Sequence, residues 1–161
     1  MGLDMYLFAQ HYISKVNWEK SDPDNIVENE DYTAVVNTLD CRDVIDKEEV
    51  TGFTIDIPIG YWRKANAIHN WFVKEMADGR DECQYIYCGK ENLEELRSLC
   101  SNVLKKKDVA YSQENLPTHS GFFFGSTDYN DWYYQDLETT IEILDRALAS
   151  KYNTFVYRAS W

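Results

Sequence analysis

The stretch 51–77, TGFTIDIPIGYWRKANAIHNWFVKEMA, decides the fold that we expect for this chain. Its first nine residues alternate apolar and polar side chains, which is typical of a strand with one buried face. Gly60 then predicts a turn, and the residues from Tyr61 to about Ala77 predict a helix that ends before Asp78. The apolar residues at helical spacing, which we expect to be buried, are Ala65, Ile68, Phe72 and Met76.

Further strands and helices are predicted on both sides of this stretch. The strand-forming segments are Leu3–Tyr12, Cys83–Cys88 and Thr154–Trp161. Helices are predicted at Glu91–Leu104 and from about Asn130, the second after a cap at Ser126, Thr127 or Asp128. The expected buried stripes are Leu93, Leu96, Cys100 and Val103 on the first helix, and Leu137, Ile141, Leu144 and Leu148 on the second. Three segments remain. Glu19–Tyr32 is expected to be a loop, and Tyr32–Asp46 has room for a short helix. Gly121–Gly125 is expected to be a short strand or a tight loop.

The 161 residues are expected to form a single α+β domain over positions 1–161. Apolar helix stripes and half-polar strands predict a mixed or mostly antiparallel sheet with about three helices packed on it. Because strand and helix segments alternate along much of the chain, a parallel α/β sheet is the alternative.

The formal net charge of −12 limits the partners of the chain. Binding to a nucleic acid backbone depends on Lys and Arg, so neither nucleic acid nor an anionic membrane surface is expected as a partner. No apolar run approaches the about 20 residues of a membrane span. Surface carboxylates that keep the protein soluble explain the charge. The alternative is that the acidic surface mimics DNA and binds a host protein.

The sequence predicts a cytoplasmic protein. The start, MGLDMY, lacks the basic region of a secretory signal, and the four cysteines contain no CxxC pair and match no zinc spacing. Reduced thiols are therefore expected. Aromatic residues make up 15% of the chain, so several rings are expected at a surface or in a pocket, and pairing into a homo-oligomer stays open.

The segment Tyr61–Phe72 is the strongest candidate for a binding surface. On the predicted helix, Arg63, Asn66 and Asn70 share one face, where a solvated helix would carry Glu and Lys. A guanidinium pairs with phosphate or carboxylate, an amide with the edge of a base or sugar, and a ring stacks on a flat ligand. The alternative is structural, with the Trp side chains packed on the sheet and Arg63 paired with a carboxylate. The candidate ligand-binding residues here are Tyr61, Trp62, Arg63, Lys64, Asn66, His69, Asn70 and Trp71.

A second candidate is Thr118–Tyr129, in which two glycines bracket three phenylalanines before a helix start. Backbone N–H groups at such a start attract anions, so Ser126, Thr127 and Asp128 complete the predicted ligand-binding set. The lysine and the glycine spacing of a phosphate-binding P-loop are missing. A capped helix after a buried strand is the alternative.

The acidic residues and histidines form no catalytic or metal-binding signature. Four carboxylates lie near the predicted helix start: Asp128, Asp131, Asp136 and Glu138. At this position they would complement the helix dipole, and the alternatives are a divalent metal site or a salt bridge to Arg63. The three histidines, His11, His69 and His119, lack HExxH or HxH spacing. We predict no catalytic residue, no metal and no cofactor, although His69 and His119 would support acid–base chemistry if they met near Ser120 or Asp128.

Three blocks of the sequence resemble small proteins encoded by bacteriophages and prophages. The blocks are MGLDMY at 1–6, YWRKAN with IH and WF at 61–72, and GFFFGSTDY at 121–129 followed by Trp132 and Tyr133. Together they span most of the chain. The resemblance implies a phage genome as the setting and the host cytoplasm as the place of action. Small phage proteins of this size often act on host factors, including immune signalling.

These observations lead us to expect a non-enzymatic, phage-type protein that binds a small anionic, ring-containing ligand. A nucleotide-derived host immune signal fits this description. Arg63 and Lys64 would contact its anionic group, and the amides and aromatic rings would contact its polar edges and its flat face. One alternative is an acidic protein-interaction inhibitor or DNA mimic, which would use its carboxylates. The other is a small nucleotide hydrolase with His69 or His119 as its base.

Overall fold

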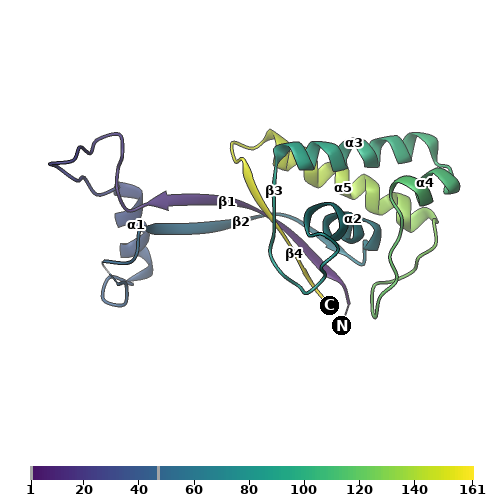
Figure 1. Cartoon of the computed structure of the whole chain (residues 1–161), viewed down its shortest axis with the longest axis horizontal. Helices are drawn as coiled ribbons and strands as arrows, with labels where there is room; N and C mark the ends of the chain where they lie inside the picture. Colours follow the sequence, from purple (N-terminus) through teal and green to yellow (C-terminus); the bar gives the residue numbers. More distant parts are fainter. Residues whose placement is uncertain (1, 47) are drawn as a thin grey trace. The chain divides into compact units, whose positions relative to one another are not determined.

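Figure 1 shows the computed structural model, which describes residues 2–46 and 48–161. The described residues form four strands and five helices. The strands are β1 (Asp4–Ser14), β2 (Gly52–Arg63), β3 (Ile86–Gly89) and β4 (Thr154–Ser160). The helices are α1 (Glu30–Leu39), α2 (Asn66–Met76), α3 (Lys90–Lys106), α4 (Val109–Asn115) and α5 (Asp131–Ala149).

The four strands form one antiparallel sheet in the order β2-β1-β4-β3. β4 pairs with β1 so that Leu7 lies opposite Tyr157, and with β3 so that Cys88 lies opposite Phe155. The predicted α+β class with a mostly antiparallel sheet is confirmed, and the parallel α/β alternative is wrong. Alternation of strands and helices along a chain does not fix strand direction, and here the last strand inserts antiparallel between β1 and β3.

The described residues contain five helices, more than the about three that the sequence predicts. α4 lies where no element is predicted, because it has only seven residues and one buried side chain, Ser112. α1 begins at Glu30, inside the segment expected to be a loop. Asn29 caps it by accepting a hydrogen bond from the Asp31 N–H at 3.0 Å, so a capping signal outweighs the acidic composition there.

The chain divides into two compact units. The smaller unit is His11–Asp56, and the larger unit joins the residues up to Gln10 with Ile57–Trp161. The smaller unit has an apolar cluster of its own, built from Ile13, Tyr32 and Val36. The larger unit contains the candidate site described below. That the whole chain is a single domain stays a prediction.

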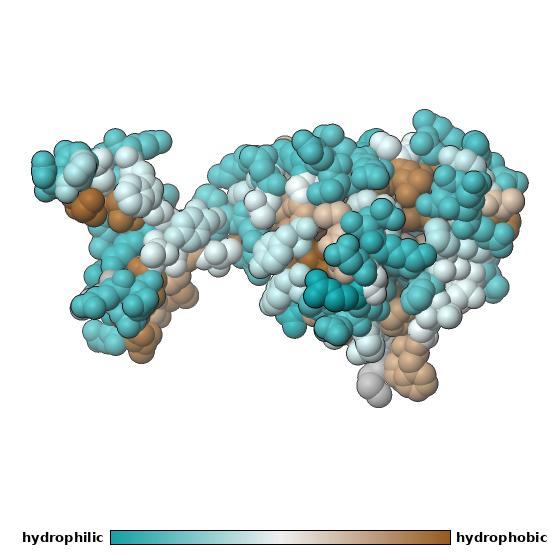
Figure 2. All heavy atoms as spheres, in the orientation of Figure 1, coloured by the Kyte–Doolittle hydropathy of each residue, from teal (hydrophilic) through white to brown (hydrophobic). Residues whose placement is uncertain are grey.

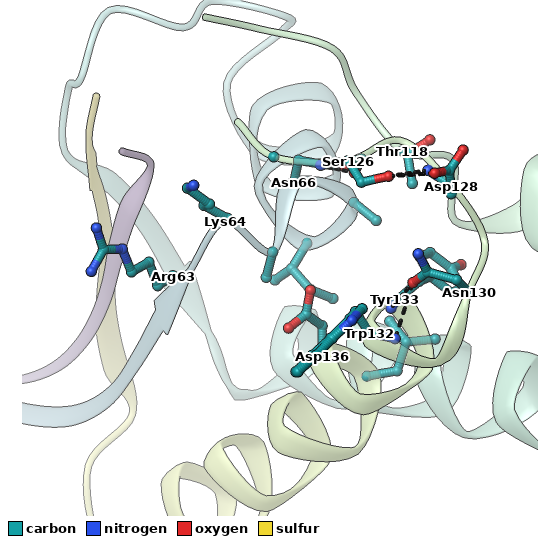
Figure 3. A pocket seen from close by; sticks show the side chains of 15 residues that line it. Arg63, Lys64, Asn66, Thr118, Ser126, Asp128, Asn130, Trp132, Tyr133 and Asp136 are labelled. Carbon is teal, nitrogen blue, oxygen red and sulfur yellow. Dashed lines mark hydrogen bonds between the residues drawn. The ribbon is translucent and has the colours of Figure 1, made fainter. Parts of the chain in front are cut away.

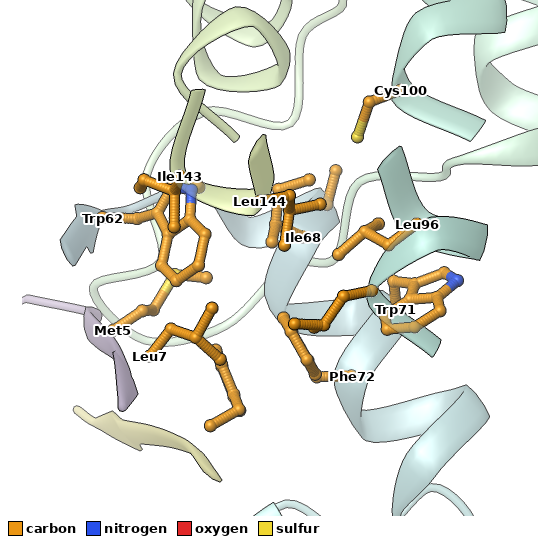
Figure 4. Packing of buried hydrophobic residues seen from close by; sticks show 14 of the residues in the cluster. Met5, Leu7, Trp62, Ile68, Trp71, Phe72, Leu96, Cys100, Ile143 and Leu144 are labelled. Atoms are coloured by element: carbon orange, nitrogen blue, oxygen red, sulfur yellow. The ribbon is translucent and has the colours of Figure 1, made fainter. Parts of the chain in front are cut away.

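In the larger unit, α2, α3, α4 and α5 lie on one side of the sheet (Figure 1). Met5, Leu7 and Ala9 of β1 are buried at alternate positions, as expected for a strand with one covered face. The Phe72 ring of α2 stacks on the Tyr157 ring of β4 with 4.0 Å between centroids. Figure 4 shows side chains of β1, β2, α2, α3 and α5 meeting in this core. The predicted stripe of α3 is confirmed, and in α5 Leu137 and Leu144 are buried while Ile141 and Leu148 are partly buried.

β2 continues beyond the predicted turn, and α2 starts at Asn66, later than the predicted start at Tyr61. The Lys64 N–H donates to the Leu3 carbonyl oxygen at 2.8 Å, so the pairing with the start of the chain extends past the glycine. A tight turn follows at Ala65 (φ −73°, ψ 68°), where the Asn66 N–H donates to the Lys64 carbonyl oxygen at 2.8 Å. The three residues before Lys64 therefore alternate across the sheet instead of sharing a helical face.

Gly60 lies inside β2, and the packing of α5 explains why a glycine occupies this position. A Cβ atom added at Gly60 would lie 2.2 Å from Cγ2 and 3.0 Å from Cδ1 of Ile143. Contacts this short are not tolerated, so Ile143 packs directly on the β2 backbone only because residue 60 has no side chain. The predicted turn at Gly60 is thus wrong, because close packing on a strand requires glycine as much as a turn does.

We expect Gly60→Ala to lower the free energy of unfolding by about 2 kcal/mol, because overpacking a filled core typically costs about 1–3 kcal/mol. Urea denaturation measures the change. Gly89→Ala is the matched control, because a Cβ atom there would have its nearest neighbour at 3.9 Å; it should cost less than about 1 kcal/mol. Equal losses in the two variants would contradict the packing of Ile143 on Gly60.

Candidate functional site

A cavity of about 330 Å³ lies between the start of α2, the loop 118–128 and the first two turns of α5 (Figure 3). Ligand pockets typically measure about 300–1,000 Å³, so the cavity has room for a small molecule. Five of the predicted ligand-binding residues line it: Arg63, Lys64, Asn66, Ser126 and Asp128. The cavity thus joins the two sequence segments that we singled out as candidate binding surfaces.

The buried side chain of Asn66 ties α2 to the loop that walls the cavity. Its Nδ2 donates to the carbonyl oxygens of Phe124 at 3.1 Å and Ser126 at 2.8 Å. Its Oδ1 accepts a hydrogen bond from the His119 N–H at 3.2 Å. Both amide donors are therefore used within the protein, and Asn66 shapes the cavity rather than offering a free donor to a ligand.

Lys64 stands at the edge of the cavity in an uncommon conformation. Its φ of 62° lies in the left-handed region, which side chains other than glycine, asparagine and aspartate rarely adopt. The Lys64 stem packs over Gly125, where an added Cβ atom would lie 3.2 Å from Lys64 Cβ. Gly125 itself has a φ of 90°, which favours glycine. Within the part of the chain that the structure describes, the Lys64 ammonium is in no ion pair.

Arg63 lies at the end of β2, and its guanidinium points away from the other labelled lining residues in Figure 3. An added Cβ atom at Gly2 would lie 3.7 Å from Arg63 Nε, so the guanidinium runs beside the start of the chain. The alternative of a salt bridge between Arg63 and the carboxylates near α5 is not found among the described residues. An added Cβ atom at Gly2 would also lie 3.4 Å from Lys64 Cε, and Figure 3 shows the Lys64 ammonium turned outward, so neither cation points into the cavity.

The first turn of α2 opens on the cavity without a side-chain cap. Ala65 occupies the cap position, and its side chain provides no hydrogen-bond acceptor. Among the described residues, the backbone N–H groups of Ala67 and Ile68 have no hydrogen-bond acceptor, and both residues line the cavity. The positive end of the α2 dipole therefore lies at this wall of the cavity.

The opposite wall belongs to α5, which begins after Asn130. Asn130 Oδ1 accepts hydrogen bonds from the N–H groups of Trp132 at 3.0 Å and Tyr133 at 3.4 Å. The cap is therefore Asn130, and the prediction of a cap at Ser126, Thr127 or Asp128 is wrong. The side chains of Ser126 and Asp128 bond to each other within the loop, and Thr127 is exposed. The Trp132 side chain is 75% exposed and lines the cavity, which leaves its ring open to a ligand.

Two carboxylates line the cavity, and they differ in their partners. Asp128 Oδ2 accepts a hydrogen bond from Ser126 Oγ at 2.8 Å, and the Asp128 N–H donates back to that oxygen at 3.0 Å. Asp136 is half-buried, and within the described residues its carboxylate has no hydrogen-bond or ion-pair partner. Burial raises the Asp136 pKa to about 6.

Several predicted ligand-binding residues lie in the core instead. Trp62 Nε1 donates to Thr140 Oγ1 at 2.9 Å, Asn70 Nδ2 donates to the Pro117 carbonyl oxygen at 3.0 Å, and Trp71 is buried. Two further predicted residues are exposed: Tyr61, whose hydroxyl donates to Asp4, and Thr127, whose carbonyl oxygen accepts from Thr118 Oγ1. The residues that line the cavity but were not in the predicted set include Asn130, Trp132, Tyr133 and Asp136. Two features of the sequence could have indicated these residues: an Asn–Asp pair at a helix start and a tryptophan among polar neighbours.

His69 is the centre of a buried hydrogen-bond chain. Its Nδ1 lies 2.7 Å from the Tyr157 hydroxyl and its Nε2 lies 2.9 Å from Asp81 Oδ2. An ionised Asp81 only accepts, so Nε2 carries the proton and the Tyr157 hydroxyl donates to Nδ1. Burial lowers the His69 pKa, which keeps the ring neutral. The rings of His69 and His119 both lie close to the Phe124 ring, with centroids 5.2 and 6.2 Å from it. Neither His69 nitrogen is left for a substrate.

Comparison of the chain with protein-family models, with curated proteins and with solved structures gives no match. In the described residues, no group of three or more His, Cys, Asp and Glu side chains has the arrangement of a metal site. No helix in residues 2–46 or 48–161 is long and apolar enough to cross a membrane. The function of the cavity is therefore inferred from its own geometry.

We expect the Asp136 carboxyl to make the protein less stable as the pH rises through about 6. The folded pKa is raised, so its contribution to stability is fully present below the unfolded pKa of about 4 and is lost as the pH rises through the folded pKa. Asp136→Asn removes this loss. The variant should unfold in urea with a free energy about 1 kcal/mol above the wild type at about pH 7.5, a value reduced for partial exposure.

The difference between the two proteins should shrink at about pH 5, because the wild-type carboxyl then takes up its proton. Urea denaturation at both pH values measures it. A difference that is absent, or that does not change with pH, would contradict the assignment of a desolvated, unpartnered carboxyl to Asp136.

Proposed function

We propose that this chain is a non-enzymatic, phage-type protein that binds a small anionic, ring-containing ligand in the cavity between α2 and α5. The observation that carries the proposal is the convergence of three unlike groups on one cavity. These are the uncapped start of α2, the exposed ring of Trp132 and the carboxylate of Asp136. A nucleotide-derived host signal has the matching parts, and withdrawing it would oppose a host response.

The anionic part of the ligand fits the α2 side of the cavity. There the two N–H groups of Ala67 and Ile68 are donors without partners among the described residues. Charge-assisted hydrogen bonds to such donors are about twice as strong as neutral ones. The flat part of the ligand fits the α5 side, because stacking on an exposed ring such as Trp132 contributes about 1–3 kcal/mol per base.

Binding without turnover agrees with the placement of His69. His69 uses both ring nitrogens in the core, so it is not placed to act as a general base. Sequestration requires only affinity, which a pre-shaped cavity provides at low cost in ordering. The Asn66 amide holds the loop 118–126 in place without a ligand, so this wall of the cavity is already formed before binding.

We expect Trp132→Ala to weaken the ligand at least about ten-fold, because stacking on an exposed ring contributes about 1–3 kcal/mol. The Trp132 side chain is exposed, so the free energy of unfolding should stay within about 0.5 kcal/mol of that of the wild type. Isothermal titration with GMP, AMP, cyclic GMP, cyclic AMP and ADP-ribose measures the affinity. Thermal melting of the same variant checks its fold.

Trp18→Ala is the matched control for Trp132→Ala. It removes an equally exposed ring that belongs to the smaller unit and does not line the cavity, so the affinity should stay unchanged. If no compound of the panel binds the wild type, the proposal is wrong, and an acidic inhibitor of a host protein becomes the better hypothesis. That alternative is favoured by the net charge of −12 and by the mostly hydrophilic face visible in Figure 2.

A further inference from the structure

The Asp136 side chain is the polar group of the cavity that has most to gain from a ligand. It projects from the second turn of α5, and Figure 3 shows its carboxylate turned toward the start of α2. Within the described residues no N–H or O–H group donates to it, whereas the other lining carboxylate, Asp128, is bonded to Ser126. A carboxylate withdrawn from water without a donor is unfavourable, so a donor on the ligand would offset that cost.

We propose that Asp136 accepts two adjacent N–H groups from the ligand, and that the cavity therefore takes a guanine nucleotide. This inference rests on the proposed function and names the ligand class for the same cavity. A carboxylate has two oxygens in one plane and pairs best with two parallel N–H donors, as it does with arginine. Guanine presents such a pair, the ring N1–H and the exocyclic N2 amino group, on one edge.

Other bases fit this edge less well. Adenine presents its amino group beside a ring nitrogen that accepts, so one carboxylate oxygen would face another acceptor. Hypoxanthine keeps the N1–H but lacks the amino group, which leaves one oxygen without a donor. A site that is built to pair with a donor discriminates strongly against an analogue that lacks the donor, because its own buried polar group is then unpaired.

The distribution of charge in the cavity distinguishes a nucleotide from a simple anion or a simple cation. A free phosphate would meet the start of α2 but would be repelled by Asp136. An amine would satisfy Asp136 but would leave the start of α2 without an anion. A guanine nucleotide places its phosphate at one wall and its donor edge at the other, with its ring beside Trp132.

The test is isothermal titration of the full chain with GMP, IMP and AMP at about pH 7.5. The wild type should bind GMP at least about ten-fold more tightly than IMP or AMP. Asp136→Asn should lose this preference and bind GMP and IMP about equally, since its amide nitrogen cannot accept the N1–H or the N2 amino hydrogen. Glu138→Gln, which changes an exposed carboxylate on the same helix outside the cavity, should keep the wild-type preference. Thermal melting confirms that each variant is folded.

The outcomes separate this inference from the proposed function. If the three nucleotides bind the wild type equally, or if Asp136→Asn keeps the preference for GMP, the guanine assignment is overturned while nucleotide binding stands. If phosphate alone binds as tightly as GMP, the cavity is an anion site and the assignment is again overturned. If GMP, IMP and AMP all fail to bind, the inference is overturned, and the proposed function is wrong as well if cyclic GMP, cyclic AMP and ADP-ribose also fail to bind.

Discussion

One buried amide, the side chain of Asn66, is the constraint on which the candidate site depends. Three hydrogen bonds join it to the backbone of the loop 118–126, and the loop has no strand or helix to hold it otherwise. Leaving such buried backbone groups unpaired would cost about 1–3 kcal/mol each. The amide therefore fixes the distance between the start of α2 and the chain that leads into α5. The cavity exists because that distance is kept.

The groups that could meet a ligand are placed by close backbone contacts on either side of this clamp. Gly60 lets Ile143 pack on β2, which positions α5 and with it Trp132 and Asp136. Gly125 gives the Lys64 stem a flat surface on the opposite side. The left-handed conformation of Lys64 lets the chain leave β2 and turn into α2, which places the start of α2 at the cavity.

The sequence predicts the class of the fold well and the site only in part. Hydrophobic periodicity correctly indicated β1, α3, α5 and β4, because their buried stripes depend only on local spacing. It misplaced the start of α2, because the strand pairing of Lys64 with Leu3 is a contact over 61 positions that no local pattern records. That shift alone removes Arg63 from the face shared with Asn66 and Asn70. The hydrogen bonds that bury His69 and Trp62 are likewise long-range, so polar residues of the core resembled ligand-binding residues in the sequence.

The central claim is that a nucleotide occupies the cavity beside Trp132, and the indole N–H signals of the chain test it directly. Five tryptophans give five such signals in a two-dimensional nitrogen–proton spectrum. On titration with GMP, the Trp132 signal should move and saturate, while the signal of Trp18, in the smaller unit, should stay in place. A spectrum in which the Trp132 signal does not move, or in which Trp18 moves as much, would contradict the account.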